Sequence, residues 1–218
     1  MTEIERLFEA VSEVAKVTGD VANRHFGKSI AVETKADGSP VTAADRGAEQ
    51  AAREWIGKRF PADAILGEEF GLAGDPDRRR WLIDPIDGTK SFVAGVPLWG
   101  SLIAVVEGET VLAGAINCAA AGEMVVAARG MGAWWNGARC RVSPRNTLSS
   151  ATVLTTDDRF PGRPARQEAW NRLASHARIA RTWGDCFGYL MVATGRAEVM
   201  VDDTMNPWDS ACLIPMPR

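Results

Sequence analysis

The sequence has 218 residues, of which 46% are apolar, and a formal charge of −3 at neutral pH. This length and apolar content suffice for one large domain or two small ones with a hydrophobic core, and they argue against a disordered chain. No stretch approaches the ~20 consecutive apolar residues of a membrane span, and the first six residues carry two acids where a secretory signal would carry basic residues. We therefore expect a soluble, cytoplasmic protein without membrane contact.

Residues that bind transition metals or nucleic acid are few or scattered. The four cysteines form no Cys-x-x-Cys pair, and the only histidines are His25 and His176, so zinc ligands are scarce. A hard metal held by oxygen is compatible with this composition. The one basic run, residues 78–80, follows a Gly-Asp-Pro-Asp loop, and no nucleic-acid partner is expected.

The first 60 residues carry helical patterns. Apolar side chains recur at helical spacing over residues 2–26, and Thr2 with Glu5 forms a capping box. The segments that follow are a strand over 29–34, a loop over 35–40 and a helix over 43–60 that begins after Thr42.

After residue 60 the pattern changes to short apolar runs bounded by Gly, Pro and Asp, which predict strands of a buried sheet. These runs cover 64–66, 81–83, 101–106, 111–117, 124–128, 133–135 and 153–155. A helix is predicted over 164–175, and strand and helix then alternate over 179–182, 187–194, 198–201 and 207–214. This order predicts layered sheets and helices, with two halves that share a cleft.

The most informative segment has carboxylates at strand ends. Asp84 closes the apolar run over 81–83, Pro85 prevents regular ladder pairing, and residues 87–89 form a turn that can start a helix. This turn directs Asp84 and Asp87 to one point, and Glu68 follows a neighbouring strand. Because three clustered carboxylates are costly without a cation and oxygen is the ligand that Mg²⁺ prefers, we expect a Mg²⁺ site with a phosphate-binding helix N-terminus beside it.

Some of these motifs also occur for simpler reasons. An isolated Asp-Pro-x-Asp-Gly is usually only a turn, but here Glu68-Glu69 precedes it and a Trp-Asp pair at 208–209 begins a helix. The Gly27-Lys28-Ser29 segment lacks the earlier glycine of a P-loop, because Ala22 stands there. His25 and His176 lie in or beside helices, which favours surface or capping roles.

Two segments, Trp81–Phe92 and Trp208–Ala211, resemble the signatures of the inositol monophosphatase superfamily of Mg²⁺-dependent, lithium-sensitive phosphatases. Asp37–Asp45, Ala133–Gly137 and Gly184–Cys186 support the resemblance, which covers essentially the whole chain. It implies an α+β fold, namely the layered α-β-α-β-α sandwich of the inositol monophosphatase and fructose-1,6-bisphosphatase-like sugar phosphatases, usually as a homodimer.

The resemblance also implies a two-metal mechanism, with a third, weaker ion near Asp45. Thr89 and Glu68 would orient and deprotonate the attacking water, while the cations stabilise an in-line displacement at phosphorus. Asp45 has the alternative role of an acid in the first turn of a helix. The ligand sets implied are Glu68, Asp84 and the carbonyl of Ile86 for one Mg²⁺, and Asp84, Asp87 and Asp209 for the other.

Substrate contacts are implied for Asp87, Gly88, Thr89, Asp185 and Asp202, and Lys35 matches a mobile loop over the site. Asp185 could accept hydrogen bonds from the ammonium of an amino-alcohol phosphate. Asp202 stands where relatives commonly carry a Glu that contacts the substrate, and its side chain is shorter by one carbon.

Within the superfamily the sequence is most similar to the histidinol-phosphatase branch. Four segments carry this likeness: 39–42, 92–100, 155–156 and 184–189. The expected function is hydrolysis of L-histidinol phosphate in histidine biosynthesis. The rivals are the same chemistry on inositol 1-phosphate or a nucleotide 3′-phosphate, and a weakly active protein that binds metal and phosphate.

The expected organisation is a single domain over 1–218, with a metal-binding half over about 1–145 and a substrate half over about 146–218. Relatives continue past the Trp-Asp helix with a strand and a closing helix, so the substrate half is expected to be truncated. The rival of weak activity rests on this difference.

Overall fold

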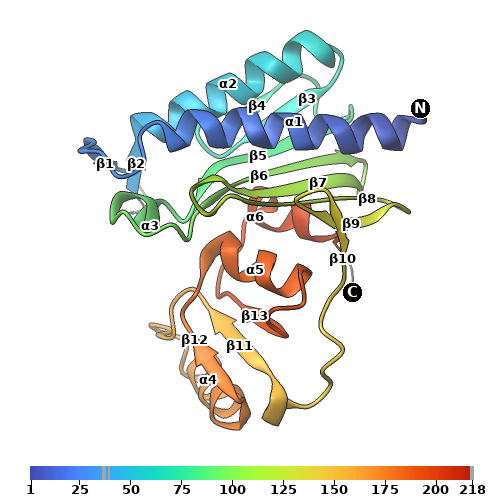
Figure 1. The fold of residues 1–218 in the computed structure, drawn as a ribbon. Coiled ribbons are helices and arrows are strands. Elements are labelled where there is room, and N and C mark those ends of the chain that lie inside the picture. The colour runs from blue at the N-terminus through green and yellow to red at the C-terminus, as the bar shows by residue number, and fades with distance from the viewer. Residues whose placement is uncertain (36–37, 39, 217–218) are drawn as a thin grey trace.

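The computed structural model describes residues 1–35, 38 and 40–216. From one side to the other, the chain forms a pair of long helices, an eight-stranded sheet, a layer of short helices, a three-stranded sheet and one outer helix (Figure 1). This arrangement confirms the expected α-β-α-β-α sandwich. Among the described residues, no helix has both the length and the apolar composition that crossing a bilayer requires.

The elements have the following bounds. The helices are α1 (Glu3–Asn23), α2 (Ala43–Arg59), α3 (Thr89–Val93), α4 (Pro164–His176), α5 (Asp185–Ala193) and α6 (Pro207–Ser210). The larger sheet contains, in spatial order, β10 (Ala138–Cys140), β9 (Gly132–Trp135), β8 (Glu123–Ala128), β7 (Thr110–Cys118), β6 (Gly100–Glu107), β5 (Arg80–Asp87), β3 (Ala64–Gly67) and β4 (Gly71–Ala73). The smaller sheet contains β12 (Ile179–Arg181), β11 (Thr152–Thr155) and β13 (Val199–Val201), and β1 (Val32–Thr34) pairs with β2 (Pro40–Thr42).

Both long helices begin at the predicted caps. The Thr2 hydroxyl accepts a hydrogen bond from the Glu5 backbone at 3.2 Å, and the Glu5 carboxylate accepts one from the Thr2 backbone at 2.7 Å. Thr42 and Asp45 form the same reciprocal capping box at the start of α2. The helices are therefore fixed at their first turns, and they end at Asn23 and Arg59, slightly earlier than the apolar pattern predicts.

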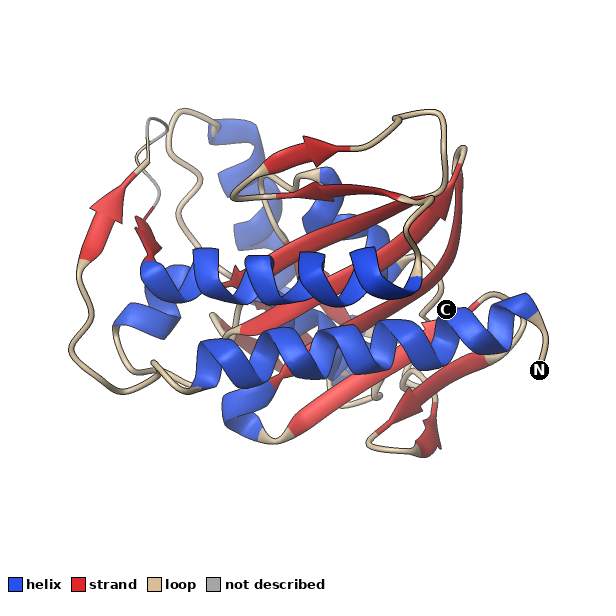
Figure 2. Cartoon of the chain, turned by 90° about the horizontal axis from the view of Figure 1, so that it is seen from above, coloured by secondary structure: helices blue, strands red, loops and turns tan. Residues whose placement is uncertain are grey.

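The helices α1 and α2 lie side by side across one face of the larger sheet (Figure 2). Their apolar stripes and that face of the sheet form one buried cluster, and each fully buried side chain of this size contributes about 1.5–3 kcal/mol to stability. This cluster fastens the first half of the chain together. Its largest members include Leu7, Val11, Ile56, Trp81 and Ile103.

The opposite face of the larger sheet packs on α5 and α6, which separate it from the smaller sheet (Figure 1). Leu82, Leu102 and Ile116 of the larger sheet share a buried cluster with Leu190 of α5. The smaller sheet is parallel and is covered on its outer side by α4. The short helices of the middle layer thus join the two halves.

The prediction that a strand closes at Asp84 is wrong, because β5 continues to Asp87. Asp84 pairs with Leu102 and Asp87 with Gly100, so β5 has one extra residue between the pairs. In a regular strand, residues three apart point to opposite faces. The extra residue is a bulge that turns Asp87 to the side of Asp84, and the Ser101 hydroxyl donates to the Pro85 carbonyl within it at 2.7 Å.

The sequence analysis missed three short strands, β2, β4 and β10. Each has three residues and lies at an edge or in a small hairpin, so it shows no alternation of apolar and polar side chains. The segment 207–214, predicted as one element, is a four-residue helix followed by a 3₁₀ turn over Ala211–Leu213.

Candidate active site

Two strands and one helix bring four predicted carboxylates together. Glu68 directly follows β3, which runs parallel to β5, and the Glu68 backbone N–H donates to the Ile83 carbonyl at 3.1 Å. Asp84 and Asp87 come from the bulged end of β5, and Asp209 comes from α6, which packs against β5. The sheet edge therefore collects side chains that are far apart in sequence.

These carboxylates are crowded in a buried place. Burial raises the pKa of Asp84 well above its usual range, and the charges of Glu68, Asp87 and Asp209 raise it further. Burial also raises the pKa of Asp87, and the charges of Asp185 and Asp209 add to this effect. Burial is also the main cause that raises the pKa of Asp209. The carboxylates of the cluster therefore repel one another when they are ionised.

Three of the four carboxylates, those of Asp84, Asp87 and Asp209, accept a hydrogen bond from a backbone N–H. The backbone N–H of Ile86 donates to Asp84 at 3.0 Å, and that of Cys186, at the start of α5, donates to Asp87 at 2.5 Å. The backbone N–H of Asn206 donates to Asp209 at 2.6 Å. These bonds hold the side chains in defined directions.

Lys35 neutralises part of the cluster. Its Nζ lies 2.7 Å from Glu68 and 2.6 Å from Glu69. Burial lowers the pKa of Lys35, but the hydrogen bonds to these two carboxylates outweigh burial, and its pKa is raised. The predicted loop residues Asp37 and Ser39 beside it lie outside the described residues.

The oxygen donors of this cluster fit a hard divalent cation. As the side chains of the described residues lie, no three carboxylates, histidines or cysteines already converge on one point. The buried, mutually repelling carboxylates and the Ile86 carbonyl are nevertheless an all-oxygen donor set, which is the kind that Mg²⁺ takes. A cation would relieve the repulsion that raises the pKa values of Asp84 and Asp87.

Thr89 and Asp45 lie next to this cluster. The Thr89 hydroxyl is 3.1 Å from the Ile86 carbonyl and 3.3 Å from one oxygen of Asp45. The other oxygen of Asp45 accepts from the backbone and hydroxyl of Thr42 at 2.7 and 2.6 Å. Asp45 is therefore a helix cap and a neighbour of Thr89 at once, which combines the two roles weighed for it.

Gly88 and Asp185 connect the two halves of the chain. Gly88 has φ +84°, and a Cβ atom there would lie 2.8 Å from the Asp185 carboxylate, so the close approach requires glycine. The Ser91 hydroxyl donates to Asp185 at 3.1 Å. Burial, partly opposed by Ser91 and helped by the charge of Asp202, raises the pKa of Asp185 to about 6.

Two cavities of about 310 Å³ each open around Asp185. The first has acidic side chains, and Asp202 in it accepts a hydrogen bond from the Thr156 backbone at 3.2 Å. Glu68, Gly88 and Thr89 line the second. The predicted residues Asp45, Asp84 and Ile86 are buried behind these walls. The first cavity is lined by Asp87, Lys90, Asp157, Arg159, Asp185, Tyr189, Asp202, Asp203 and Asp209, among others.

Some contacts of this site have no signal in the sequence. Ser91 reaches Asp185 across 94 positions of sequence, and the Cys186 backbone reaches Asp87 across 99. No local pattern signals such contacts, because they depend on how the halves pack. Tyr189 differs from these residues. It lines the first cavity, and it could have been identified from the sequence, because it ends the segment 184–189 that carried the family likeness.

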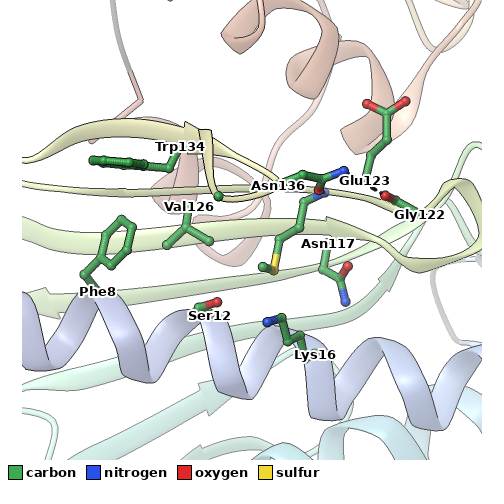
Figure 3. A pocket seen from close by; sticks show the side chains of 11 residues that line it. Phe8, Ser12, Lys16, Asn117, Gly122, Glu123, Val126, Trp134 and Asn136 are labelled. Atoms are coloured by element: carbon green, nitrogen blue, oxygen red, sulfur yellow. Dashed lines mark hydrogen bonds between the residues drawn. The ribbon is translucent and has the colours of Figure 1, made fainter. Parts of the chain in front are cut away.

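Another cavity, about 590 Å³, lies away from the cluster, between α1 and the strands β8 and β9 (Figure 3). Lys16, Phe8 and Trp134 contribute to its walls. The Asn117 amide donates to the Ala15 carbonyl at 2.8 Å. The Asn136 side-chain oxygen accepts from the Met124 backbone N–H at 2.8 Å, and its nitrogen donates to the Gly122 carbonyl at 3.0 Å. The amides of Asn117 and Asn136 thus stabilise the fold, and none of the predicted site residues lines this cavity. We assign it no role.

Comparison with known proteins places the chain among phosphatases. The inositol monophosphatase family matches residues 3–216. A histidinol-phosphatase from Chlorobaculum parvum is 45% identical over 206 residues, which cover 94% of this chain and 79% of that protein. A histidinol-phosphatase from Mycobacterium tuberculosis is 38% identical and covers 84% of this chain and 72% of its own length.

Solved structures agree with this placement. The extragenic suppressor protein suhB from Bartonella henselae superposes with a TM-score of 0.90 at 28% identity, covering 97% of this chain and 83% of that one. An IMPase from Thermotoga maritima superposes with a TM-score of 0.84 at 30% identity, covering 98% and 81%. The chain belongs to the inositol monophosphatase family of phosphatases.

Proposed function

We propose that this protein is a histidinol-phosphatase, which hydrolyses L-histidinol phosphate to L-histidinol and phosphate. The observation that carries the substrate assignment is the acidic cavity beside the carboxylate cluster. The similarity to two histidinol-phosphatases supports it independently. The inositol of the rival substrate is neutral, whereas the amino alcohol of this substrate carries an ammonium group.

Enzymes of this family depend on metal ions, and the cluster supplies suitable ligands. We assign Glu68, Asp84 and the Ile86 carbonyl to one Mg²⁺, and Asp84, Asp87 and Asp209 to a second. When bound, these cations offset the charge of the phosphate and make phosphorus more electrophilic. A third ion near Asp45 belongs to the same proposal.

The side chains around the cluster handle the attacking water and the phosphate. Thr89 orients the water through its hydroxyl, which is held by the Ile86 carbonyl at 3.1 Å. Glu68 accepts the proton of that water, since its carboxylate is partly exposed to the cavity. Backbone N–H groups at Gly88 and Thr89 bind a phosphate oxygen, and Asp87 fixes the orientation of the ester.

Asp185 and Asp202 receive the leaving group. Asp157 is paired with Arg159 at 2.9 Å, and Asp203 is paired with Arg163 at 3.1 Å, so their charges are offset. Asp185 and Asp202 line the same cavity and form no ion pair within the described residues. A cationic ammonium is the group that this imbalance of charge favours.

The test is phosphate release from L-histidinol phosphate, inositol 1-phosphate and a nucleotide 3′-phosphate, each with Mg²⁺ and with a chelator. We expect L-histidinol phosphate to have the highest kcat/KM and release to require Mg²⁺. Asp87→Asn is the matched control, and it should lower kcat by at least about 100-fold.

Two results would contradict this assignment. Faster turnover of inositol phosphate would identify the protein as an inositol monophosphatase with the same site. Equal release by the wild-type protein and Asp87→Asn would refute the catalytic assignment of the cluster.

The proposal includes a quaternary and a domain arrangement. We propose one catalytic unit in which residues of about 1–145 supply the cation ligands other than Asp209, and residues of about 146–218 bind the leaving group. We also propose a homodimer as the active form. Val93, Val96 and Trp183, which are 42%, 40% and 38% exposed, are apolar side chains available for such a contact. Light scattering after size exclusion measures the mass directly, and lithium inhibition tests the family likeness.

A further inference from the structure

Helix α2 contributes a second acidic residue, Glu49, one turn after Asp45. It belongs to the buried face of the helix with Ala48 and Ala52, and its side chain is fully buried. Buried carboxylates are rare unless hydrogen bonds and a counter-charge hold them. Neither cavity near the cluster is lined by Glu49, so its role is not contact with a substrate.

All partners of Glu49 belong to the turn that carries Glu68 or support it. One oxygen accepts from the Glu69 backbone N–H at 2.7 Å, and the other accepts from the Phe70 backbone N–H at 3.2 Å. Arg53, one turn further along α2, donates to Glu49 at 2.7 Å and to the Gly71 carbonyl at 2.5 Å. Glu49 and Arg53 together therefore hydrogen-bond to three successive residues of the turn, 69–71.

Glycine at position 67 leaves the space that the Glu49 carboxylate occupies. A Cβ atom there would lie 2.0 Å from the nearer oxygen of Glu49, far inside contact distance. The Glu68 backbone N–H is held separately by the Ile83 carbonyl at 3.1 Å. Glu68 is therefore fixed by β5 at its own amide and by Glu49 at the next two amides.

We infer that Glu49 is a positioning residue: by binding the backbone after Glu68, it fixes the direction of the Glu68 carboxylate towards Asp84. This inference rests on the proposed role of Glu68 in catalysis and cation binding. Since Asp45 contacts Thr89 from the preceding turn of α2, one helix then orients both side chains proposed to act on the water.

The variant Glu49→Gln tests this inference, because the amide keeps the size but places a donor where an acceptor is needed. Hydrogen exchange should show faster exchange of the Glu69 and Phe70 amides. Calorimetric titration with Mg²⁺ and no substrate should show binding weakened by about 10–100-fold, as for other residues that orient metal ligands. In turnover, kcat should fall while KM changes little, because the leaving-group cavity is not touched.

Glu198→Gln is the matched control. Glu198 is also nearly buried, accepts from the Thr152 backbone at 2.6 Å and pairs with Arg145 at 3.0 Å, but it stabilises the smaller sheet. It should lower the melting temperature without weakening Mg²⁺ binding. Equal Mg²⁺ affinities for the two variants would overturn the positioning role and leave Glu49 a structural residue.

A milder variant covers the case in which Glu49→Gln does not fold. Arg53→Gln removes the bonds to Glu49 and Gly71 but keeps both backbone bonds of Glu49, so an intermediate loss of Mg²⁺ affinity is expected. Unchanged Mg²⁺ affinity would again contradict the inference. If Mg²⁺ binding weakens as expected but the wild-type protein releases no phosphate from any ester, the proposed function fails and the positioning role stands.

Discussion

At the scale of single residues, Asp87 shows how this site exchanges stability for function. Its carboxylate gains a hydrogen bond from the Cys186 backbone, but burial and the nearby charges of Asp185 and Asp209 raise its pKa, so its ionised form is disfavoured. Residues held in such unfavourable environments are a common cost of an active site.

Replacement of Asp87 by Asn should therefore make the cation-free protein more stable. Asparagine keeps an acceptor for the Cys186 N–H and removes one of the repelling charges. We expect a higher melting temperature in chelator and a smaller gain on adding Mg²⁺, both measured by calorimetry. A lower melting temperature in chelator would show that the hydrogen bond outweighs the repulsion.

Asp185 gives a second prediction at this scale, on selectivity. Its backbone has φ +50°, which asparagine also tolerates, so Asp185→Asn should fold normally. Loss of a charge-assisted bond of about 1.4 kcal/mol should raise KM for L-histidinol phosphate about tenfold. Inositol 1-phosphate, which has no ammonium, serves as the control substrate, and an equal rise in its KM would exclude charge recognition by Asp185.

At the scale of elements, helix α1 docks on β7 through one glycine. The Asn117 amide of β7 donates to the Ala15 carbonyl at 2.8 Å, and a Cβ atom at Gly19 would lie 2.4 Å from the same amide nitrogen. Helix propensity favours alanine over glycine by about 1 kcal/mol. Overpacking in a buried contact costs about 1–3 kcal/mol. This cost outweighs the gain in helix propensity, so replacing Gly19 by alanine should destabilise the protein.

We therefore expect Gly19→Ala to lower the free energy of unfolding by about 1–2 kcal/mol in denaturant titrations. Gly57→Ala in α2 is the matched control, because nothing lies within 4 Å of its Cβ position and the residue is exposed. That variant should gain about 0.5–1 kcal/mol. Stabilisation by both substitutions would show that Asn117 moves aside freely.

Elements are also where sequence and structure can be compared. The caps Thr2 and Thr42 and the helical periodicity predict α1 and α2 closely, because these signals are local. The bulge in β5 could not be predicted, since it depends on how Asp87 pairs with Gly100 of another strand. The residue pattern alone predicted a Mg²⁺ site at Glu68, Asp84 and Asp87, and the family resemblance added Asp209 and the Ile86 carbonyl. The contact of Ser91 depends on packing between the halves, so no local pattern signals it. Glu49 had a weak signal, an acid on an otherwise apolar helix face.

At the scale of the whole molecule, the cluster links stability to pH. Burial first, and then mutual repulsion, raise the pKa values of Asp84 and Asp87, and the Asp185 pKa is raised from 3.8 to about 6. In the pH range between the ordinary and the raised values, the native state binds more protons than the unfolded chain. Stability must then fall as pH rises through that range.

In chelator, the melting temperature should therefore decrease from about pH 5 to about pH 7. Carboxylates with lowered pKa values, such as Glu33 and Asp157, are ionised in both states over this range and do not oppose the trend. Excess Mg²⁺ should flatten the dependence, because a bound cation favours the ionised carboxylates. A melting temperature that rises with pH in chelator would contradict the assignment of these buried charges.

The three parallel strands of the smaller sheet have a kinetic consequence. The antiparallel strands from β5 to β9 can pair as successive hairpins, whereas β11, β12 and β13 need long crossovers before they pair. Contacts between distant segments form slowly, so we expect Asp84 and Asp87 to be in place before α5 and Asp209 reach them. The last step of folding then brings like charges together, and Mg²⁺ should accelerate the slow phase of refolding in stopped-flow fluorescence. A cation would in that case act as a folding partner before it serves in catalysis.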